Sequence, residues 1–434
     1  MSGLSSENSI ALDDRNEPTL HNSESSLPPV DRGKDAWLFL AASFVIEALV
    51  WGFPFSYGVF HEYYSTHEPF AGSSNIAVIG TCAMGIMYLD LIFVFALLKT
   101  WPRLQRWATA GGLFVMCLAL ALSSFATKTT ELIVTQGVIY AIGGSFAYSP
   151  CILYMDEWFA KRIGLAYGIM WAGTGLAGVV LPLVMEWLLR AYGFQTTLRV
   201  WAICLFVLTA PLLYFVKPRI PVAAKSKPRK LDFTFLKTTI FGIHQLCNVI
   251  EALGFFLPTI YLPSYASSMG ASGTLSALTV ILFNVASVFG CVFMGSIVDK
   301  WHVTTCILIS TIGSTISVFI VWGFSMSLPP LYVFCLIYGF FAGSFTSAWP
   351  GIMRDVRKKK ASADPSIVFA CLAAGRGIGN LVSGPLSEAL IDGFPWRGDA
   401  GFAYGSGYGT LIVFTGVTAL FGGSSILGRR IGLV

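Results

Sequence analysis

The sequence VIEAL occupies residues 45–49 and occurs again at residues 249–253, 204 positions further along the chain. Each copy places a carboxylate, Glu47 or Glu251, midway along an otherwise apolar run. An acid inside hydrocarbon costs several kcal/mol, so two acids at matching depths indicate a duplicated functional unit. A repeat of this length in an apolar chain is typical of a membrane protein built from two parallel halves.

The composition supports a membrane location. Of the 434 residues, 55% are hydrophobic and 12% are charged, with a mean hydropathy of +0.69, whereas a soluble domain carries about 25% charged residues. The nine cysteines stand singly in apolar runs, which supports neither a disulfide framework nor a metal site. The sequence has no Walker-type nucleotide motif and no catalytic constellation. We therefore expect no enzyme activity, no cofactor, no metal, and no nucleotide or nucleic-acid partner.

Long apolar runs alternate with short polar joints, and each run is long enough to cross a hydrocarbon core of about 30 Å. The sequence therefore predicts an all-α membrane protein with twelve transmembrane helices in two pseudo-symmetric six-helix bundles. The predicted spans are residues 36–60, 75–98, 107–127, 131–154, 162–188, 196–216, 238–262, 273–298, 303–324, 331–353, 366–391 and 403–427.

The basic residues predict the orientation. With the N-terminus inside, the cytoplasmic segments hold 23 of the 28 Lys and Arg residues and the outer loops hold 4, while Arg376 lies within a span. Because cytoplasmic loops carry the excess of Lys and Arg, we expect both termini in the cytoplasm and a multi-pass protein of the plasma membrane. The predicted domains are a disordered cytoplasmic tail (1–34), an N-terminal bundle (35–217), a cytoplasmic linker (218–236) and a C-terminal bundle (237–434).

The two repeated glutamates are candidates for proton coupling. Glu47 and Glu251 could each load and release a proton as access alternates between the two sides of the membrane; the other interpretation is a neutral acid hydrogen-bonded to a neighbouring helix. His244 stands about two helical turns before Glu251 and is either a proton relay or a core histidine. The same 204-residue shift carries Tyr57 onto Tyr261, which makes both tyrosines candidates for the substrate site.

Arg376 is the one cation deep within a predicted span. Its guanidinium cannot be deprotonated, so it requires an anion or carbonyl oxygens beside it. It can bind an anionic substrate group bidentately, and the flanking Gly375 and Gly377 would leave room for that group. The alternative is a structural pair with an acid such as Asp90.

Four stretches resemble signatures of the monocarboxylate porter family within the major facilitator superfamily. Residues 31–37 (DRGKDAW) are similar to the N-terminal signature of that family, although Arg32 breaks its usual glycine pair. Residues 158–173 (WFAKRIGLAYGIMWAG) match the second signature. Residues 261–266 and 376–380 resemble the fungal branch.

A gate motif of the superfamily is also present. Residues 295–300 (GSIVDK) resemble the Gly-x-x-x-Asp-Arg/Lys motif, whereas the counterpart in the first half, residues 99–103, has lost the acid. The resemblance implies a gate that contains Asp299, Lys300, Lys161 and Arg162.

Departures from the family pattern bear on the cargo. Proton-coupled monocarboxylate carriers have a lysine where this chain aligns Phe55, and an aspartate and an arginine where it aligns Ser287 and Cys291. Losing charged ligands argues against a small charged substrate, and Phe55 favours a larger, more amphipathic one. The predicted substrate-binding residues are Arg376, Phe55, Tyr57, Tyr261 and Cys291.

The sequence thus predicts a secondary active or facilitative transporter that moves an organic metabolite by alternating access. Efflux of a secondary metabolite is the first hypothesis. Proton-linked uptake of a monocarboxylate, a related organic acid or a vitamin is the alternative, and a non-transporting nutrient sensor of the same fold is a third. The expected partners are a small organic substrate that can be anionic, protons and the lipid bilayer.

Overall fold

The computed structural model describes residues 27–73, 75–221 and 231–433 of the chain. Within these residues the regular structure is helical and no strand is formed, which confirms the predicted all-α fold class. Most of the predicted tail (residues 1–26) and the basic centre of the predicted linker (residues 222–230) lie outside the described residues.

The first half of the chain forms one bundle of apolar helices. Its first pass is interrupted at Ser56, two residues after Pro54, because proline lacks the N–H that would continue the helical ladder. The elements of this half are α2 (Lys34–Phe55), α3 (Tyr57–Thr66), α4 (Ile76–Leu89), α5 (Leu91–Thr100), α6 (Pro102–Ser123), α7 (Thr129–Leu132), the π-helix η1 (Ile133–Ile139), α8 (Tyr140–Leu153), α9 (Met155–Trp158), α10 (Ile163–Thr209) and η2 (Ala210–Tyr214).

The longest helix, α10, consists of two passes joined at Gly193. Gly193 has φ 74° and ψ 171°, a conformation that glycine adopts readily. The apolar stretch Ile163–Tyr214 has 52 residues, whereas about 20 residues suffice to cross the hydrocarbon core. The described residues contain eleven candidate spans, and counting this one twice gives twelve passes.

The second half forms a second bundle of the same kind. Its elements are η4 (Thr234–Lys237), α11 (Thr239–Ser268), α12 (Gly273–Val298), α13 (Val303–Ile316), the π-helix η5 (Ser317–Trp322), α14 (Leu328–Phe341), η6 (Phe345–Ala348), α15 (Trp349–Lys359), α16 (Pro365–Ile391), η7 (Phe402–Ser406), α17 (Gly409–Gly422) and α18 (Ser425–Arg430).

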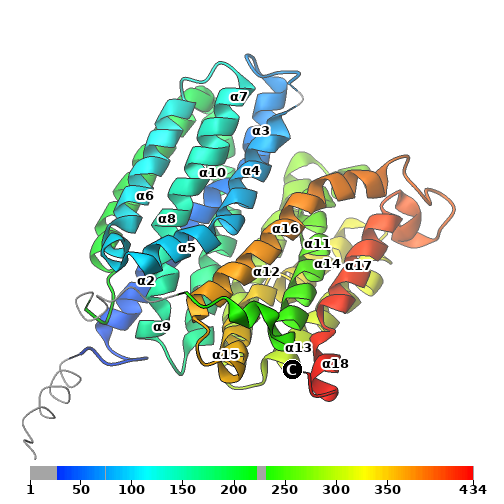
Figure 1. Cartoon of the computed structure of the whole chain (residues 1–434). Helices are drawn as coiled ribbons and strands as arrows, with labels where there is room; N and C mark the ends of the chain where they lie inside the picture. The colour runs from blue at the N-terminus through cyan, green and yellow to red at the C-terminus, as the bar shows by residue number, and fades with distance from the viewer. Residues whose placement is uncertain (1–26, 74, 222–230, 434) are drawn as a thin grey trace, which may run out of the picture.

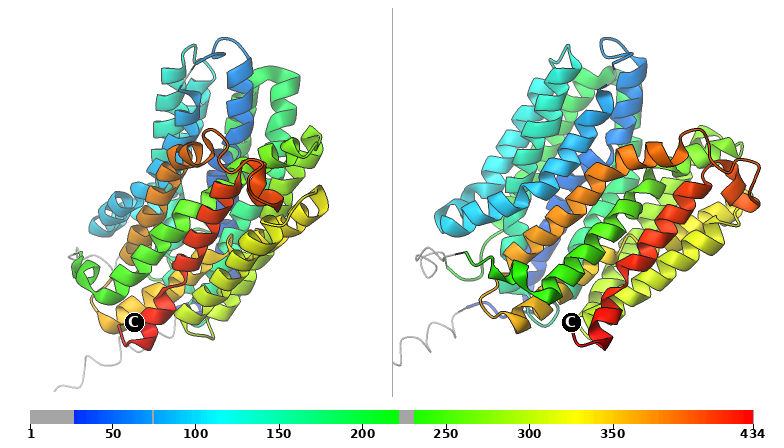
Figure 2. Two further views of the ribbon diagram at one scale, coloured as in Figure 1. Left: turned by 90° about the vertical axis from the view of Figure 1, so that its right-hand side faces the viewer. Right: turned by 45° about the vertical axis from the view of Figure 1, so that its right-hand side comes forward.

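The two bundles lie side by side and are closer at one end than at the other. In Figure 1 they meet at the lower end, where α9, α15 and α18 lie, and diverge toward the upper end, where α3 and α7 lie. The two further views in Figure 2 show the same arrangement. The beginning of α2 and the end of α18 are both at the lower end (Figure 1). The main contacts between the bundles join α10 to α12, and α16 to α4 and α5.

The apolar core has the same asymmetry. One cluster of buried residues fills the N-terminal bundle and continues into the lower end of the C-terminal bundle, where it includes Met294, Trp349 and Phe369. A separate cluster, which includes Tyr265 and Trp322, fills the remainder of the C-terminal bundle. The continuous core therefore joins the two bundles at their lower end.

Large apolar side chains also cover the outside of the molecule. Phe93, Phe114 and Phe289 expose 76%, 67% and 65% of their surface. Apolar side chains exposed around a whole bundle, rather than in one patch, are stable against lipid and not against water. The structure therefore supports an integral, multi-pass membrane protein.

Glycines allow the bundles to touch through their backbones. A Cβ atom on Gly168 of α10 would lie 2.3 Å from the carbonyl oxygen of Cys291, and one on Gly295 of α12 would lie 2.3 Å from that of Gly164. Helices in membranes approach this closely through small residues. A side chain at either glycine must push α10 and α12 apart.

We predict that Gly168→Leu separates the lower ends of the bundles and lowers the melting temperature, since overpacking costs about 1–3 kcal/mol. Spin labels at Lys161 and Lys300, which are exposed at this end in opposite bundles, would report the separation by pulsed electron resonance. Gly111→Leu is the matched control, because a Cβ at Gly111 meets no atom within 4 Å. An unchanged label distance in Gly168→Leu would contradict the packing described here.

Candidate functional site

A buried ion pair lies inside the C-terminal bundle. Nη1 of Arg376 (α16) is 2.7 Å from Oε2 of Glu251 (α11), and the two residues expose 2% and 6% of their surface. The guanidinium also lies over the ring of Phe255, 4.2 Å from its centroid. A charge that cannot be neutralised thus receives a carboxylate and an aromatic face, the two kinds of group that stabilise it in a dry interior.

Two expectations for Arg376 need correction. Its partner is Glu251 and not Asp90, whose Oδ1 accepts a hydrogen bond from Ser145 Oγ at 2.6 Å. The flanking glycines serve packing rather than space for a ligand. A Cβ on Gly375 would lie 2.3 Å from Nε2 of Gln245, and one on Gly377 would lie 2.7 Å from Cβ of Tyr88.

Glu47, the counterpart of Glu251 in the first half, has a different environment. Its Oε1 accepts a hydrogen bond from Thr174 Oγ1 of α10 at 2.7 Å, and the phenol of Tyr148 lies beside the same carboxyl group. Glu47 exposes 2% of its surface, and no ion pair involves it among the described residues. The two repeated acids therefore differ in their partners: Glu251 pairs with the fixed cation Arg376, whereas Glu47 contacts hydroxyl groups.

Tyr88 of α4 connects the two acids. It interacts with Arg376 and lies within electrostatic range of both Glu47 and Glu251. Its ring is 4.7 Å from that of Trp51. The structure thus brings the three ionisable residues selected from the sequence around one tyrosine of the N-terminal bundle.

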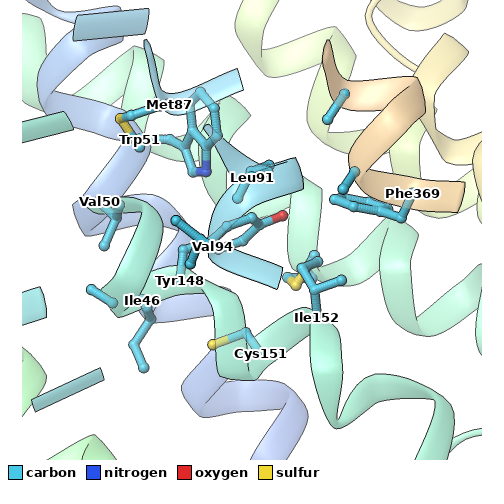
Figure 3. Packing of buried hydrophobic residues seen from close by; sticks show 14 of the residues in the cluster. Ile46, Val50, Trp51, Met87, Leu91, Val94, Tyr148, Cys151, Ile152 and Phe369 are labelled. Carbon is cyan, nitrogen blue, oxygen red and sulfur yellow. The ribbon is translucent and has the colours of Figure 1, made fainter. Parts of the chain in front are cut away.

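An aromatic wall in the N-terminal bundle includes Tyr88, the ring that interacts with Arg376. We define it as Trp51, Tyr88 and Tyr148, because Trp51 contacts both tyrosines, at 4.7 Å and at 6.0 Å between centroids. In Figure 3 Trp51 lies beside Met87, and Tyr148 lies beside Leu91. Phe55 continues the wall, 6.3 Å from Trp51 and 36% exposed.

The other predicted substrate-binding residues have structural partners. The Tyr57 hydroxyl donates to the Ile76 carbonyl at 2.5 Å. The Tyr261 hydroxyl accepts from Ser387 Oγ at 3.4 Å. Cys291 is buried, and its Sγ lies 3.6 Å from the Gly343 carbonyl. Their contribution to substrate binding stays a prediction.

Below this site, aromatic rings from both bundles pack around Phe369 of α16. Its partners are Phe95, Tyr167, Trp171 and Trp349, with ring centroids 5.4–6.1 Å from that of Phe369. Figure 3 shows Phe369 on a helix that faces the N-terminal bundle. We call this group the aromatic plug; it closes the space between the bundles at the lower end. Single aromatic residues in apolar runs gave no sequence signal for it.

Two polar contacts hold the bundles together at the lower end. Asp299, from the predicted gate motif, caps the start of α10, because its two carboxylate oxygens accept the Gly164 and Leu165 N–H groups at 2.7 and 2.9 Å. On the other side, Lys99 Nζ donates to Asp364 Oδ2 at 3.0 Å. The first-half counterpart of the gate motif has no acid of its own. An acid from the other bundle, Asp364 at the start of α16, takes its place.

The other three predicted gate residues, Lys300, Lys161 and Arg162, are exposed. Lys161 and Arg162 take part in contacts at the lower end through their backbone N–H groups. Asp31 accepts hydrogen bonds from the backbone N–H groups of Ala160, Lys161 and Arg162, each at 3.0 Å. Two of the four stretches that resemble family signatures, residues 31–37 and 158–173, thus contact each other directly.

No cluster of three or more His, Cys, Asp or Glu side chains suited to a metal ion occurs within the described ranges. The site consists of one fixed cation, two buried acids and aromatic rings, divided between two bundles. A twelve-pass fold with such a site at the boundary of its two halves defines a membrane transporter.

Comparison with known proteins gives the family. Residues 92–302 and 245–422 match the model of the Major Facilitator Superfamily, so the chain belongs to that superfamily. The MFS transporter asaE of Aspergillus flavus is 25% identical over 405 residues, which cover 93% of this chain and 88% of the relative.

Two further fungal relatives are named as efflux proteins. The agnestins efflux protein AgnL12 of Paecilomyces divaricatus is 28% identical over 415 residues, or 94% of this chain and 90% of the relative. The aspyridones efflux protein apdF of Emericella nidulans is 23% identical over 426 residues, which cover 97% of this chain and 83% of the relative. The predicted transporter class is thereby confirmed.

We predict that Asp31→Asn destabilises the protein by about 1–2 kcal/mol, as the loss of a helix cap does. Burial opposes ionisation of Asp31, but its hydrogen bonds to three backbone N–H groups dominate and lower its pKa. A lowered folded-state pKa gives a contribution that is complete above the unfolded-state pKa and is lost as the pH falls through the folded-state value. Thermal unfolding at pH 7 and pH 3 should therefore show a wild-type advantage that shrinks in acid.

We predict that Arg376→Gln alone lowers the free energy of unfolding by about 3–5 kcal/mol, because it leaves Glu251 as a buried unpaired charge. The double variant Arg376→Gln with Glu251→Gln should recover most of this loss, since a neutral pair needs no counter-charge. Thermal unfolding of the purified protein measures both. Losses that simply add would show that the two residues do not act as a pair.

Proposed function

We propose that this chain is a transporter of the monocarboxylate porter type that carries an amphipathic organic acid out of a fungal cell, together with a proton. It would lie in the plasma membrane with both termini in the cytoplasm, as the distribution of Lys and Arg indicates. The observation that carries the proposal is the Arg376–Glu251 ion pair, buried where the C-terminal bundle faces the aromatic wall of the other bundle.

The pair can couple an anion to a proton. A substrate carboxylate that binds Arg376 takes the place of Glu251, and the glutamate is then a buried charge without a partner. Such a charge is unfavourable by several kcal/mol, so Glu251 binds a proton instead. Substrate anion and proton are then bound together, and the bundles carry an electrically neutral acid. Glu47 is a second proton-binding candidate, with Thr174 as its neighbour.

The aromatic wall suggests which acids fit. Tyr88, which interacts with Arg376, packs with Trp51, and Trp51 packs with Tyr148. Phe55 stands where small-acid carriers have a lysine. A conjugated or aromatic body would stack on these rings while its carboxylate binds Arg376. Lactate-sized acids would leave the wall unfilled.

The direction of transport follows from the gradients. A carrier of a neutral acid moves it down the combined gradients of anion and proton, so an acid made within the cell leaves it when the outward gradient of the anion exceeds the inward gradient of the proton. The names of two relatives as efflux proteins for agnestins and aspyridones support this direction. A chain placed where the acid is abundant outside would import it by the same chemistry.

We predict that proteoliposomes containing the wild-type protein transport aromatic polyketide acids, beginning with orsellinic acid, and not their methyl esters. Arg376→Gln should weaken binding of the acid about 10- to 150-fold, because a charge-assisted hydrogen bond contributes about 1.5–3 kcal/mol. Uptake of labelled acids and ligand-induced thermal shifts measure these two effects.

Glu251→Gln provides the control for coupling. The glutamine mimics the protonated acid, so Arg376 stays available and binding persists, whereas transport no longer responds to a pH gradient. Asn284 of α12, which is half-buried and donates to the Gly178 carbonyl, offers Asn284→Ala as a variant outside the ion pair. Equal transport of acids and esters by the wild type would refute the proposal.

A further inference from the structure

His244 of α11 is a buried base without a hydrogen-bond partner. It exposes 1% of its surface, and neither ring nitrogen has a hydrogen-bond partner among the described residues. Leaving a buried polar group unpaired costs about 1–3 kcal/mol. The 204-residue shift places Leu40 at the equivalent position of the first half, so the fold can fill this position with an apolar side chain. An unpaired histidine here therefore requires another explanation.

His244 lies on the same face of α11 as Glu251. The residues at positions 244, 247, 248 and 251 follow helical spacing, and all four are buried. Their exposed fractions are 1%, 2%, 0% and 6%. Seven residues of helix correspond to about 10 Å along the axis. A proton would need only a few polar groups to pass from the glutamate to the histidine.

Polar groups occupy the first part of that distance. A cavity of about 10 Å³ adjoins Glu251 and is lined by the hydroxyls of Ser310, Ser314, Thr311 and Thr415 among others. Among the described residues, the hydroxyls of Thr311 and Thr415 have no hydrogen-bond partner. A cavity of about this size with several polar partners holds one water molecule.

The second part of the distance from Glu251 to His244 lies where α11 meets the end of α17 and the start of α18. Sγ of Cys247 is 3.2 Å from Oγ of Ser424, and the buried hydroxyl of Ser425 has no partner. A Cβ on Gly423 would lie 2.5 Å from Oγ1 of Thr311, so the cavity lining and the Ser424 region are adjacent. Polar groups therefore follow one side of α11 from Glu251 toward His244.

Toward the lower surface α11 contacts α15, and His244 lies within electrostatic range of Asp355 of α15 and of His302, which precedes α13. Oδ2 of Asp355 is 3.4 Å from Nε2 of His302, and its Oδ1 is 2.9 Å from Nζ of Lys358. Arg354 and Arg429 are the other charged side chains at this cluster. The side chains of His302 and Lys358 are 32% and 66% exposed, which gives the cluster contact with solvent.

We propose that His244 is the proton port of the C-terminal bundle: it passes protons between Glu251 and the Asp355–His302 cluster at the lower end. When Glu251 returns to Arg376, its proton moves to the water in the cavity and along the hydroxyls to one ring nitrogen of His244. The imidazolium then releases the proton from its other nitrogen through a bridging water to Asp355, which passes it through His302 to the solvent, and the ring becomes neutral again. Each group that gains the proton loses it again, so the net change is one proton moved from Glu251 to the solvent. This inference rests on the proton coupling proposed above.

Net transport and exchange separate this role from a structural one. Proteoliposomes loaded with an aromatic polyketide acid, orsellinic acid first, would exchange it for labelled acid outside without releasing the proton, whereas net flux driven by a pH gradient requires its release. We expect His244→Gln to keep wild-type exchange and to lower net flux at least tenfold. Added imidazole should restore net flux, because it can replace the missing proton carrier.

Two further variants complete the test. His244→Leu copies the residue found in the first half and should behave like His244→Gln. His67→Gln is the matched control, since this exposed histidine lies at the upper end and bonds to Thr66. Wild-type net flux in both His244 variants, or an equal loss of exchange and net flux, would overturn the inference. A wild type that carries the acid without protons would overturn it and leave acid transport standing, whereas a wild type that carries no acid would overturn both proposals.

Discussion

A guanidinium that keeps its charge inside a hydrocarbon-facing bundle constrains everything around it. Arg376 cannot be neutralised by losing a proton, so the bundle must supply an anion, and Glu251 does so at 2.7 Å. The pair then fixes the relation of α11 to α16, whose glycines bring the helices into close contact. Glu251 is the half of this pair that can be neutralised, because it can bind a proton whereas Arg376 cannot lose one. The proposed coupling depends on that difference.

The overall architecture could be predicted from the sequence because its causes are local. Apolar length sets each span, and the repeated glutamate with its neighbours reveals the duplication. Helix interruptions were harder to predict. Pro54 does end α2, but Pro258 lies inside an unbroken α11, because an interior proline is tolerated where neighbouring groups satisfy the freed carbonyls. The bend at Gly193, by contrast, lies in the joint predicted between the spans 162–188 and 196–216.

The site could be predicted only in part, since pairing depends on how helices far apart in sequence meet. Periodicity places Glu251 and Arg376 in spans, but it does not show that α11 adjoins α16 while Asp90 faces Ser145. Tyr88 carried no sequence signal, because a single tyrosine in an apolar run resembles any lipid-facing or core residue. Its role follows from the contact between α4 and α16 alone.

The two halves share a fold and have diverged in chemistry. In the first half Glu47 is held by neutral hydroxyls, and Leu40 fills the position two turns earlier. In the second half Glu251 has a cation, and His244 stands at that position without a partner. A pair divided between moving bundles, such as Lys99 with Asp364, breaks whenever the bundles separate. The Arg376–Glu251 pair lies wholly in one bundle and the aromatic wall in the other, so the pair can persist while the bundles move.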